Sequence, residues 1–359
     1  MKYDYWFANV KGIRCRRKIQ LYAQAGSAQA LYYIEETKLK EWGCPNEERH
    51  TILESIKNWE LESEFQKLQR KNVRCVPITN AEYPNRLSAI PTPPYAIYVK
   101  GKLPDEDVKT AAIVGARECS PYGKAMAKEY AVALAKAGVQ IISGMARGVD
   151  SISQTWALES GGSSYAVLGN GVDICYPRES IELYMRLQEQ GGLISEQPLG
   201  MQPLPQFFPA RNRLISGLAD LVLVIEAKEK SGSLITADMA LEQGRDVYAL
   251  PGPATSALSM GCHNLIRQGA GILISPQELF NELGIFIGEN QKNATENKNV
   301  LDMSENLLYS CLSFQPKSLN RLFEETKFPI PKLLQALTGL ELKGYIQEIS
   351  KNYYAKVKQ

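Results

Sequence analysis

Seven short apolar runs between residues 109 and 283 alternate with segments of helical length, and this alternation constrains the fold more than any other feature of the chain. The runs are TAAIVGAR, VQIISGMA, SSYAVLGNG, GLISEQP, LVLVIEA, DVYALPG and GILI. Strands that are buried on both faces of a parallel sheet are apolar almost throughout, and helices connect them. The pattern therefore predicts an α/β fold with a doubly wound parallel sheet.

The segment after the first run shows the signals of a helix at both ends. Ser120 is a suitable N-cap, Pro121 stands at the tolerated first position, and Gly138 follows the segment as a C-terminal cap would. Apolar residues recur at helical spacing and define one buried face: Ala127, Tyr130, Ala131, Leu134 and Ala135. We expect this helix to cover one face of the sheet.

The pattern changes on either side of this region, which predicts four parts. Residues 1–82 have apolar residues at helical spacing and predict a small helical domain, and the proline-rich segment that follows predicts an extended lead-in to the core at 83–285. Residues 286–300 are rich in Asn, Lys and Glu and predict a linker. Residues 301–359 predict three short helices and a hairpin near Lys351 and Asn352, as in a winged helix.

Bulk composition excludes several classes of protein. The net charge is only +2, so any binding of nucleic acid must depend on local basic positions. The seven cysteines are dispersed without a CxxC pair and there are only two histidines, which predicts reduced thiols and no metal site. Without an apolar signal core or a stretch of about 18–20 apolar residues, we expect a soluble cytoplasmic protein with no membrane partner.

Glycine and arginine gather where three successive strands of the core are expected to end. Gly115 and Arg117 follow the first strand, Ser143, Gly144 and Arg147 follow the second, and Gly169 follows the third. Ligands of open parallel sheets bind at the carboxyl ends of the strands, and glycines let the backbone approach them closely. Tight turns without a ligand are the alternative for any single glycine, but the repetition at three strand ends favours a binding site.

The residues in these loops do not match a cofactor site or a catalytic site. A dinucleotide fingerprint needs glycine where Arg117 stands, and an acidic residue at the end of the second strand is missing. Neither a P-loop nor the motifs HExxH and GxSxG occur, and His263 is isolated beside Cys262. We therefore expect no cofactor and no enzymatic activity.

The segment from 206 to 252 is the densest in unusual residues. Arg211, Asn212 and Arg213 are expected where a helix begins, and Lys230 leads through small hydroxyl residues into another helix, an arrangement that suits a phosphate oxygen. A structural salt bridge of Arg211 or Arg213 to Asp220 or Glu226 is the alternative. The complete set of candidate binding residues is Gly115, Arg117, Ser120, Ser143, Gly144, Arg147, Gly169, Phe208, Arg211, Asn212, Arg213, Lys230, Ser231, Gly232, Ser233 and Thr236.

Together these segments resemble the DprA/Smf family of DNA-processing proteins over about residues 83–283. The matching motifs are IVGAR (113–117), SPYG (120–123), SGMARGVD (143–150), VLGNGVD-x2-YP (167–177), SEQPLG (195–200), FPARNRLISGLAD (208–220), VIEAKEKSGSLITA (224–237), GRDVYALPG (244–252) and GCHNLIRQG (261–269). The resemblance implies an extended Rossmann-like core that binds single-stranded DNA, forms a homodimer and helps to load the RecA recombinase on incoming DNA during natural transformation. The terminal parts are similar to the family's small helical domain (of the SAM or helix-hairpin-helix type) and winged helix.

Carried over by position, the resemblance implies that Arg117, Arg211 and Arg213 contact phosphates and that Lys230 to Ser233 line the same groove. Two positions depart from the family pattern: Gln154 replaces a histidine and Ser180 replaces an asparagine. The segment 11–14 only loosely resembles a helix-hairpin-helix turn, so it is assigned no contact with DNA.

Two other functions compete with the single-strand binder. The same type of fold occurs in nucleotide-processing phosphoribohydrolases of the lysine-decarboxylase-like group, but their paired-glycine PGGxGT loop is replaced by Ser231-Gly232-Ser233-Leu234-Ile235-Thr236. A scaffold that binds a free nucleotide as a regulator is the third reading. The apolar strand and helix around 224–243 are a candidate surface for the homodimer.

Overall fold

The computed structural model describes residues 1–285, 302–313 and 316–356. The chain divides into two compact units, Met1–Phe286 and Ile287–Gln359. The linker predicted at 286–300 lies outside the described residues.

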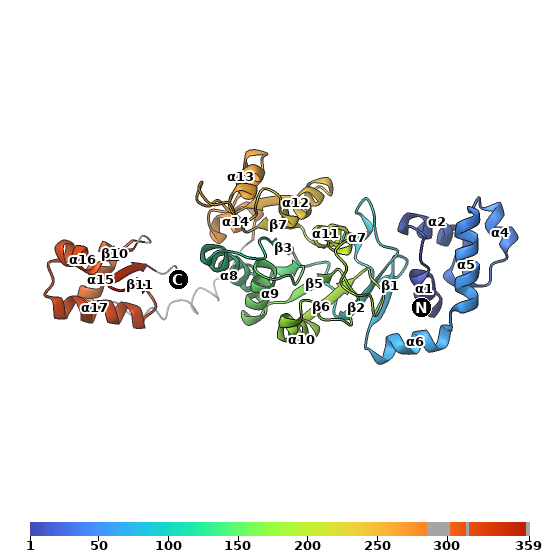
Figure 1. Ribbon diagram of the computed structural model, residues 1–359, viewed down its shortest axis with the longest axis horizontal. Coiled ribbons are helices and arrows are strands. Elements are labelled where there is room, and N and C mark those ends of the chain that lie inside the picture. Colours follow the sequence, from blue (N-terminus) through green and yellow to red (C-terminus); the bar gives the residue numbers. More distant parts are fainter. Residues whose placement is uncertain (286–301, 314–315, 357–359) are drawn as a thin grey trace. The chain divides into compact units, whose positions relative to one another are not determined.

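The first unit is built on one large sheet, drawn near the middle of Figure 1. Within the described residues this sheet has nine strands in the order β1-β2-β6-β5-β4-β3-β7-β8-β9. Their bounds are β1 Arg74–Pro77, β2 Ala96–Gly101, β3 Thr110–Val114, β4 Gln140–Ser143, β5 Ser164–Leu168, β6 Gly191–Ser195, β7 Leu221–Val224, β8 Asp246–Ala249 and β9 Gly271–Ile272. All seven predicted strands are present, and the prediction of a doubly wound parallel sheet is confirmed for them.

Two strands of the sheet were missed by the sequence interpretation. β2 pairs antiparallel with β6, and β1 pairs antiparallel with β2. The prolines before β2 favour the extended lead-in that was predicted, but they do not show that the segment joins the edge of the sheet. The parallel sheet therefore continues into an antiparallel margin.

The order of the strands fixes where a ligand can bind. The chain runs from β3 through β4 and β5 to β6 on one side, then returns to place β7 on the other side of β3. The loops that follow β3 and β7 consequently leave in opposite directions and open a crevice between them. This switch in strand order lies between β3 and β7.

Helices cover both faces of the sheet in the first unit. α8, α9, α10 and α14 pack on one face, and α7, α11, α12 and α13 pack on the other. The bounds of the helices of this unit are α1 Lys2–Asn9, α2 Cys15–Ala25, α3 Ala28–Tyr32, α4 Glu36–Glu41, α5 Asn46–Asn58, α6 Leu61–Arg70, α7 Asn85–Ser88, α8 Pro121–Lys136, α9 Val149–Glu159, η1 Arg178–Ser180 (a 3₁₀ helix), α10 Ile181–Gln190, α11 Phe207–Leu218, α12 Gly232–Glu242, α13 Met260–Arg267 and α14 Pro276–Leu283.

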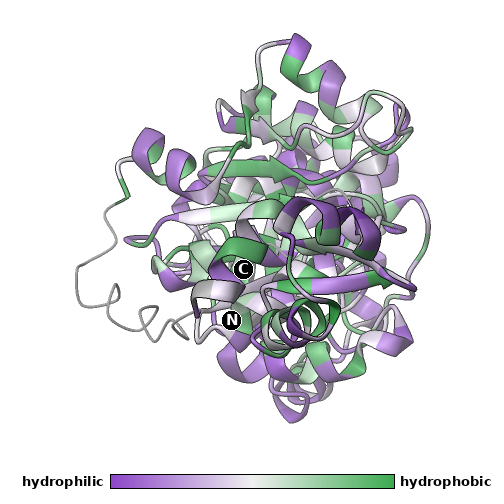
Figure 2. Cartoon of the chain, turned by 90° about the vertical axis from the view of Figure 1, so that its left-hand side faces the viewer, coloured by the Kyte–Doolittle hydropathy of each residue, from purple (hydrophilic) through white to green (hydrophobic). Residues whose placement is uncertain are grey.

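The helix predicted after the first strand forms as α8. The Ser120 side chain accepts a hydrogen bond from the Gly123 amide, and Gly138 follows the helix with φ near +80°. All five residues of the predicted apolar face are buried. Figure 2, coloured by hydropathy, shows that helices of the chain carry both hydrophobic and hydrophilic residues.

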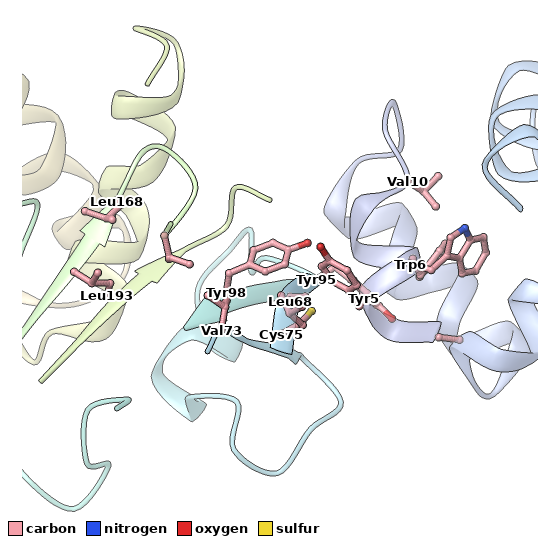
Figure 3. Packing of buried hydrophobic residues seen from close by; sticks show 14 of the residues in the cluster. Tyr5, Trp6, Val10, Leu68, Val73, Cys75, Tyr95, Tyr98, Leu168 and Leu193 are labelled. Carbon is pink, nitrogen blue, oxygen red and sulfur yellow. The ribbon is translucent and has the colours of Figure 1, made fainter. Parts of the chain in front are cut away.

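The N-terminal helices share one hydrophobic cluster with the sheet. Figure 3 shows Trp6 and Val10 on one side of this cluster, Tyr95 and Tyr98 in its middle, and Leu193 of β6 on the other side. The Asn9 amide donates a hydrogen bond of 2.9 Å to the Tyr98 hydroxyl. β1 belongs to the sheet, although it lies within residues 1–82, which were predicted to form the helical domain. The domain boundary at residue 82 stays a prediction.

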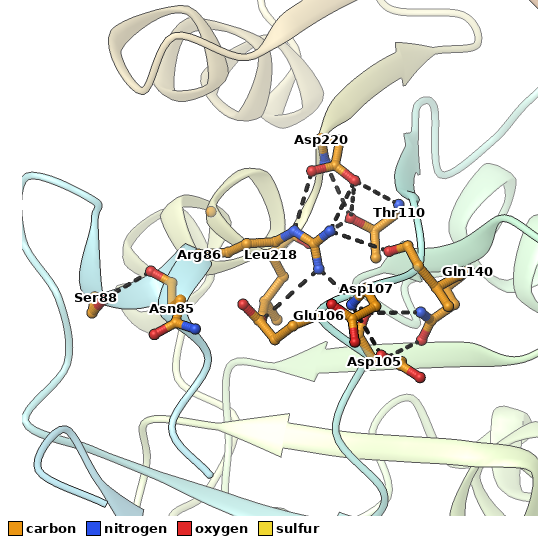
Figure 4. A network of polar contacts seen from close by, with 12 residues as sticks. Asn85, Arg86, Ser88, Asp105, Glu106, Asp107, Thr110, Gln140, Leu218 and Asp220 are labelled. Atoms are coloured by element: carbon orange, nitrogen blue, oxygen red, sulfur yellow. Dashed lines mark hydrogen bonds and ion pairs between the residues drawn. The ribbon is translucent and has the colours of Figure 1, made fainter. Parts of the chain in front are cut away.

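A polar network holds α7 against the amino ends of β3 and β7 (Figure 4). Arg86 forms an ion pair with Asp220, with an Nε–Oδ1 distance of 3.1 Å. Asp220 also accepts hydrogen bonds from the Thr110 amide and hydroxyl. This network fixes the end of the sheet opposite to the switch crevice.

The second unit has the predicted helices and hairpin. Its elements are α15 Met303–Cys311, β10 Lys317–Ser318, α16 Leu319–Thr326, α17 Ile330–Leu342, β11 Ile346–Ser350 and β12 Tyr353–Lys356. The hairpin turns at Lys351 and Asn352, and β10 adds a short third strand to it. Leu308, Leu322, Leu337 and Leu340 lie in its core. Among the described residues of the whole chain, every helix is too short or too polar to span a lipid bilayer.

Candidate anion-binding cavity

A cavity of about 540 Å³ opens at the carboxyl ends of β3, β4 and β7, where the strand order switches. Ten of the sixteen candidate residues line it: Gly115, Arg117, Phe208, Arg211, Asn212, Lys230, Ser231, Gly232, Ser233 and Thr236. They come from three separate segments of the chain. The sheet topology thus assembles a site that the sequence presents only in pieces.

The loop after β3 supplies an exposed cation. A Cβ atom at Gly115 would lie 2.8 Å from the Val149 side chain, so only glycine lets α9 pack this close to the strand end. Arg117 is exposed, and no carboxylate in the described part of the chain forms an ion pair with it. Its guanidinium lies 6.0 Å from the centre of the Phe208 ring. The charge of Arg117 is therefore available to a ligand.

The loop between β7 and α12 supplies two more cations and the start of a helix. Lys228 and Lys230 are exposed, and again no described carboxylate pairs with them. The Ser231 side chain caps α12 by accepting from the Ser233 amide, and the two hydroxyls lie 2.7 Å apart. Unpaired amides at the start of a helix attract anions, so this loop and the lysines favour the same kind of ligand.

Phe208 forms an aromatic wall of the cavity. Its ring lies 5.7 Å from the Tyr176 ring at an interplanar angle of 35°. A Cβ atom at Gly169 would lie 2.9 Å from Phe208, so this glycine makes room for the ring although it does not line the cavity. Arg117 and Arg211 both lie 6.0 Å from the Phe208 ring centre. Cations next to an aromatic face suit a ligand that carries both phosphate and a flat base.

Arg211 is buried in the wall of the cavity and is already bound. Its Nη1 donates to the carbonyl oxygens of Gly144 and Val167 at the ends of β4 and β5. Asp150, at the start of α9, accepts from the Gly144 amide at 3.1 Å. Burial raises the pKa of Asp150 and lowers the pKa of Arg211, while the charge of each opposes the shift of the other. The pair contributes to the shape of the strand ends and leaves little of the Arg211 charge for a ligand.

Two strand ends at the cavity have an uncommon backbone conformation. Met145 after β4 and Glu226 after β7 have φ of 52° and 69°. The Met145 amide donates to Gln154, one of the two departures from the family pattern, which is buried and also donates to Ser164. Non-glycine residues at positive φ cost free energy and gather at functional sites. Gln154 therefore has a clear structural role in holding this turn.

Six candidate residues do not line the cavity, namely Ser120, Ser143, Gly144, Arg147, Gly169 and Arg213. Ser143 is buried and donates to the Ile113 carbonyl, and exposed Arg147 pairs with Glu179. Ser180, the other departure, ends the 3₁₀ helix that contains Glu179.

Arg213 forms a structural salt bridge, as the alternative interpretation predicted, but the predicted partners Asp220 and Glu226 are wrong. Arg213 pairs with Glu196 at 2.7 Å and donates to the Thr92 carbonyl. Asp220 pairs with Arg86 instead, and Glu226 accepts hydrogen bonds from Ser120. The expected position of these arginines at the start of a helix is also wrong, because α11 begins at Phe207 and they lie in its second turn. Arg213 thus points its charge into an ion pair within the protein.

Sequence reasoning missed several residues of the cavity, above all Lys228 and Tyr176. Lys228 lies two residues before Lys230 in the same loop, which was a usable signal. Tyr176 follows β5 by eight residues, and nothing local predicts that it reaches Phe208. Also missed were Val114, Ala116, Glu118, Ala146, Asp150, Pro205, Pro209, Ile215, Ile235 and Leu258.

The groups expected to have no catalytic or metal-binding role have ordinary structural surroundings. His263 lies in α13, where its Nε2 is 3.0 Å from the Gly252 carbonyl oxygen. The described residues hold no group of three or more His, Cys, Asp or Glu side chains arranged to bind a metal ion.

Comparisons with known protein families give two matches. Residues 74–284 match the family described as DNA recombination-mediator protein A. Residues 292–350 match the DprA winged helix domain. Together the matches cover most of the chain beyond the N-terminal helices.

Individual relatives agree with these matches. Protein Smf of Escherichia coli (strain K12) is 37% identical over 328 residues, which is 89% of this chain and 87% of that protein. The crystal structure of DNA processing protein A from Streptococcus pneumoniae superposes with a TM-score of 0.68 at 32% identity, covering 79% of this chain and 98% of that one. A DNA processing protein A from Helicobacter pylori, whose structure was described for its single-stranded DNA binding mode, gives a TM-score of 0.53 at 29% identity and covers 59% and 97%.

Proposed function

This chain belongs to the DprA/Smf family of DNA-processing proteins, and from that premise we propose that it is a recombination mediator that grips single-stranded DNA in the cavity between β3 and β7. The binding of single strands by the Helicobacter pylori relative supports the proposal. So does the description of the family, which names a mediator of recombination and no reaction.

One observation carries the proposal: Arg117, Lys228 and Lys230 line one cavity together with Phe208. Among the described residues, no carboxylate forms an ion pair with any of the three cations. Free cations bind phosphates, while an accessible ring stacks on a base that has no partner strand. Bases inside a duplex are stacked on each other and cannot reach such a ring. The combination therefore selects single strands over duplexes.

Recognition of the backbone and of base faces gives little preference for sequence. Arginine and lysine contact phosphates in every nucleotide, and every base offers a face for stacking. Of the sixteen candidates, the ten that line the cavity are proposed to form the binding site, in which buried Arg211 shapes the wall and the exposed cations contact the phosphates. For the other six, a direct contact with DNA stays a prediction.

Fluorescence anisotropy with labelled single-stranded and double-stranded oligonucleotides tests the proposal. We expect single strands to bind at least tenfold more tightly than duplexes. Arg117→Ala and Lys230→Ala should each weaken binding and reduce the magnitude of the log–log salt slope by about 0.7, the value per phosphate contact on a single strand. Equal affinity for both forms of DNA, or no binding of single strands below the micromolar range, would sink the proposal.

The finer role proposed for the chain is to protect incoming single strands in the cytoplasm and to help load RecA on them during natural transformation. The family description supports it, because it names a mediator of DNA recombination. The test is the rate of ATP hydrolysis by RecA on single strands already coated with a single-strand-binding protein. Addition of this protein should shorten the lag before hydrolysis, and Arg117→Ala should restore the lag.

A homodimer formed through the core is part of the same proposal. The dimer surface predicted around 224–243 includes the end of β7 and α12. Because β7 lies inside the sheet, only α12 can contact a second copy, and its Leu241 is 53% exposed. β9 is the last strand in the sheet order; its residue Ile272 is 47% exposed, and Ile274, two residues after it, is 63% exposed. Sedimentation velocity should show that the wild type is a dimer and that the double variant Ile272→Glu, Ile274→Glu is a monomer. A monomeric wild type would contradict the homodimer but not the binding of single strands.

The competing enzyme is tested by incubation with nucleoside monophosphates. A phosphoribohydrolase releases the free base, which chromatography detects. We expect no released base, because the described residues of the cavity do not provide an acid and a base arranged for this reaction. The two carboxylates of the lining are Asp150, which is buried beside Arg211, and Glu118.

A further inference from the structure

A second group of free cations lies where α1 turns into α2. Lys11, Arg14 and Arg16 are all exposed, and no carboxylate in residues 1–285, 302–313 or 316–356 forms an ion pair with them. Their neighbours are engaged differently, since Arg17 pairs with Glu48 and Lys18 is buried. Three positive charges within six residues are thus exposed and without an ion-pair partner among the described residues.

The turn is fixed at the same edge of the sheet as the cavity. The Cys15 thiol, at the start of α2, donates to Glu196 Oε1 at 3.1 Å. Glu196 directly follows β6, so it marks the carboxyl end of that strand, and Arg213 donates to both of its carboxylate oxygens. The cation turn, defined as Lys11, Arg14 and Arg16, thus lies beside the carboxyl end of β6.

The cavity and the cation turn are separated by only part of the sheet edge. In the order β6-β5-β4-β3, three strand spacings, about 14 Å, separate the carboxyl end of β3 at the cavity from that of β6 beside the cation turn. A bound strand of several nucleotides can cover this span, because single-strand sites range from about 4 to about 16 nucleotides.

The segment that connects the cavity with the cation turn carries no negative charge. From Gln197 to Arg211 the chain has no acidic residue, and it passes along this edge until Phe208 and Arg211 enter the cavity. Glu196 is neutralised by Arg213. Asp173, which accepts from the Gly200 amide, pairs with Lys71. A polyanion that leaves the cavity toward β6 therefore meets neutral surface and then the cation turn.

We propose that the cation turn is a second contact region for the same single strand, which leaves the cavity across the carboxyl ends of β4, β5 and β6 and reaches Lys11, Arg14 and Arg16. This inference rests on the proposed function. It adds a direction for the bound strand and a role for the N-terminal helices, and it replaces the expectation from the sequence that segment 11–14 makes no contact with DNA.

The test compares oligonucleotides of about 4 and about 16 nucleotides, which fill the cavity alone or extend beyond it. The variant Lys11→Ala, Arg14→Ala, Arg16→Ala of the full chain should bind the short oligonucleotide as the wild type does. It should bind the long one about tenfold or more weakly, with a salt slope smaller in magnitude by about 2. The conservative variant Lys11→Arg, Arg14→Lys, Arg16→Lys should retain both values.

The matched control is Lys40→Ala, Lys57→Ala, Arg70→Ala, which removes the same charge from exposed positions on α4, α5 and α6. If the control weakens the long oligonucleotide as much as the cation-turn variant, the effect is bulk charge and the inference is wrong. Equal binding by the cation-turn variant and the wild type at both lengths also overturns it, while the proposed function stands. If the wild type binds neither oligonucleotide, the result counts against the proposed function instead.

Discussion

At the scale of single residues, three arginines that look alike in the sequence have three different roles. Arg117 is exposed and has no described carboxylate partner, Arg211 is buried against the ends of β4 and β5, and Arg213 is paired with Glu196. The role of an arginine follows from what its guanidinium meets after folding, because the fork of donors satisfies carbonyls and carboxylates as well as phosphates. Only the first of the three is free for a ligand.

This difference predicts opposite results for two substitutions. Arg117→Ala should leave the free energy of unfolding within about 0.5 kcal/mol of the wild type, as surface substitutions do. Arg213→Ala should lower it by about 1–3 kcal/mol, because Glu196 and the Thr92 carbonyl lose a partner in a partly buried place. Urea denaturation measures both, and equal stabilities would contradict the structural role of Arg213.

Lys18 predicts a pH dependence of stability. Its Nζ is buried in α2 and donates to the Ala8 carbonyl at 2.6 Å, and burial lowers the pKa of Lys18 to about 8 from its ordinary 10.5. The folded protein therefore holds this proton less tightly than the unfolded chain, so the charged lysine destabilises the fold below pH 8. That cost disappears as the pH rises from about 8 to about 10.5.

Lys18→Met removes the charge and keeps most of the side-chain volume. We expect it to increase the free energy of unfolding at pH 7 by up to about 3 kcal/mol, less what the lost hydrogen bond contributed. The gain should shrink between pH 8 and pH 10.5. Urea denaturation at several pH values gives the profile, and a gain that is constant up to pH 10.5 would refute the assignment to Lys18.

At the scale of elements, the ends of the strands make the cavity. Glycine lets α9 pack against β3, and positive φ at Met145 and Glu226 turns the chain sharply after β4 and β7. Gly148, at the N-cap of α9, has φ near 76° and lies against the carbonyl oxygens of Ala116 and Arg117. The loops after β3 and β4 are thus packed on each other, and the hydrogen bonds from Ser120 to Glu226 connect the loop after β7 to them.

Gly148→Ala should consequently damage both stability and binding. A Cβ atom there would lie 2.3 Å from the Ala116 carbonyl oxygen, so the loop with Arg117 must move. We expect a loss of 2 kcal/mol or more, roughly the strain at positive φ plus the clash, together with weaker binding of single strands.

Gly161→Ala is the control for this substitution. Gly161 has a similar φ of 78° but no atom within 4 Å of the added Cβ, so it reports strain alone. It should cost about 1 kcal/mol and leave DNA binding unchanged. Urea curves and anisotropy on both variants decide, and equal effects of the two would show that the contact with Ala116 has no special importance.

At the scale of the whole molecule, the chain consists of two units with separate hydrophobic cores. The N-terminal helices and the sheet share clusters in Met1–Phe286, and the winged-helix unit has a core of its own. Cooperativity follows contiguous packing, so each unit should unfold by itself.

The four tryptophans allow a direct test of this independence. Trp6, Trp42, Trp59 and Trp156 all lie in the first unit. Unfolding by urea, followed by tryptophan fluorescence, should therefore show one transition, whereas far-ultraviolet circular dichroism should show an additional transition from the second unit. Coincident curves would mean that the two units unfold together.

The sequence alone determined the class of fold, because apolar strands alternating with amphipathic helices are compatible with few arrangements other than a covered parallel sheet. It also determined the caps of α8 and the strand ends where the cavity lies, since these depend on local residue types. The antiparallel strands β1 and β2 could not be predicted, because pairing at a sheet edge lacks a strong local signal. The start of α11 could not be predicted either, because its N-cap residue Gln206 makes no capping hydrogen bond, in contrast to Ser120 of α8.

The tertiary structure alone decided which polar residues share a site. Arg117, Phe208 and Lys230 are far apart in the sequence and meet only because β7 returns to the side of β3. Arg213 carries the same charge next to Arg211 but turns to Glu196, an acid that lies beside it only after β6 has joined the sheet. Local residue type sets what a side chain can bind, whereas packing between distant segments decides which partner it meets first and whether its charge remains free.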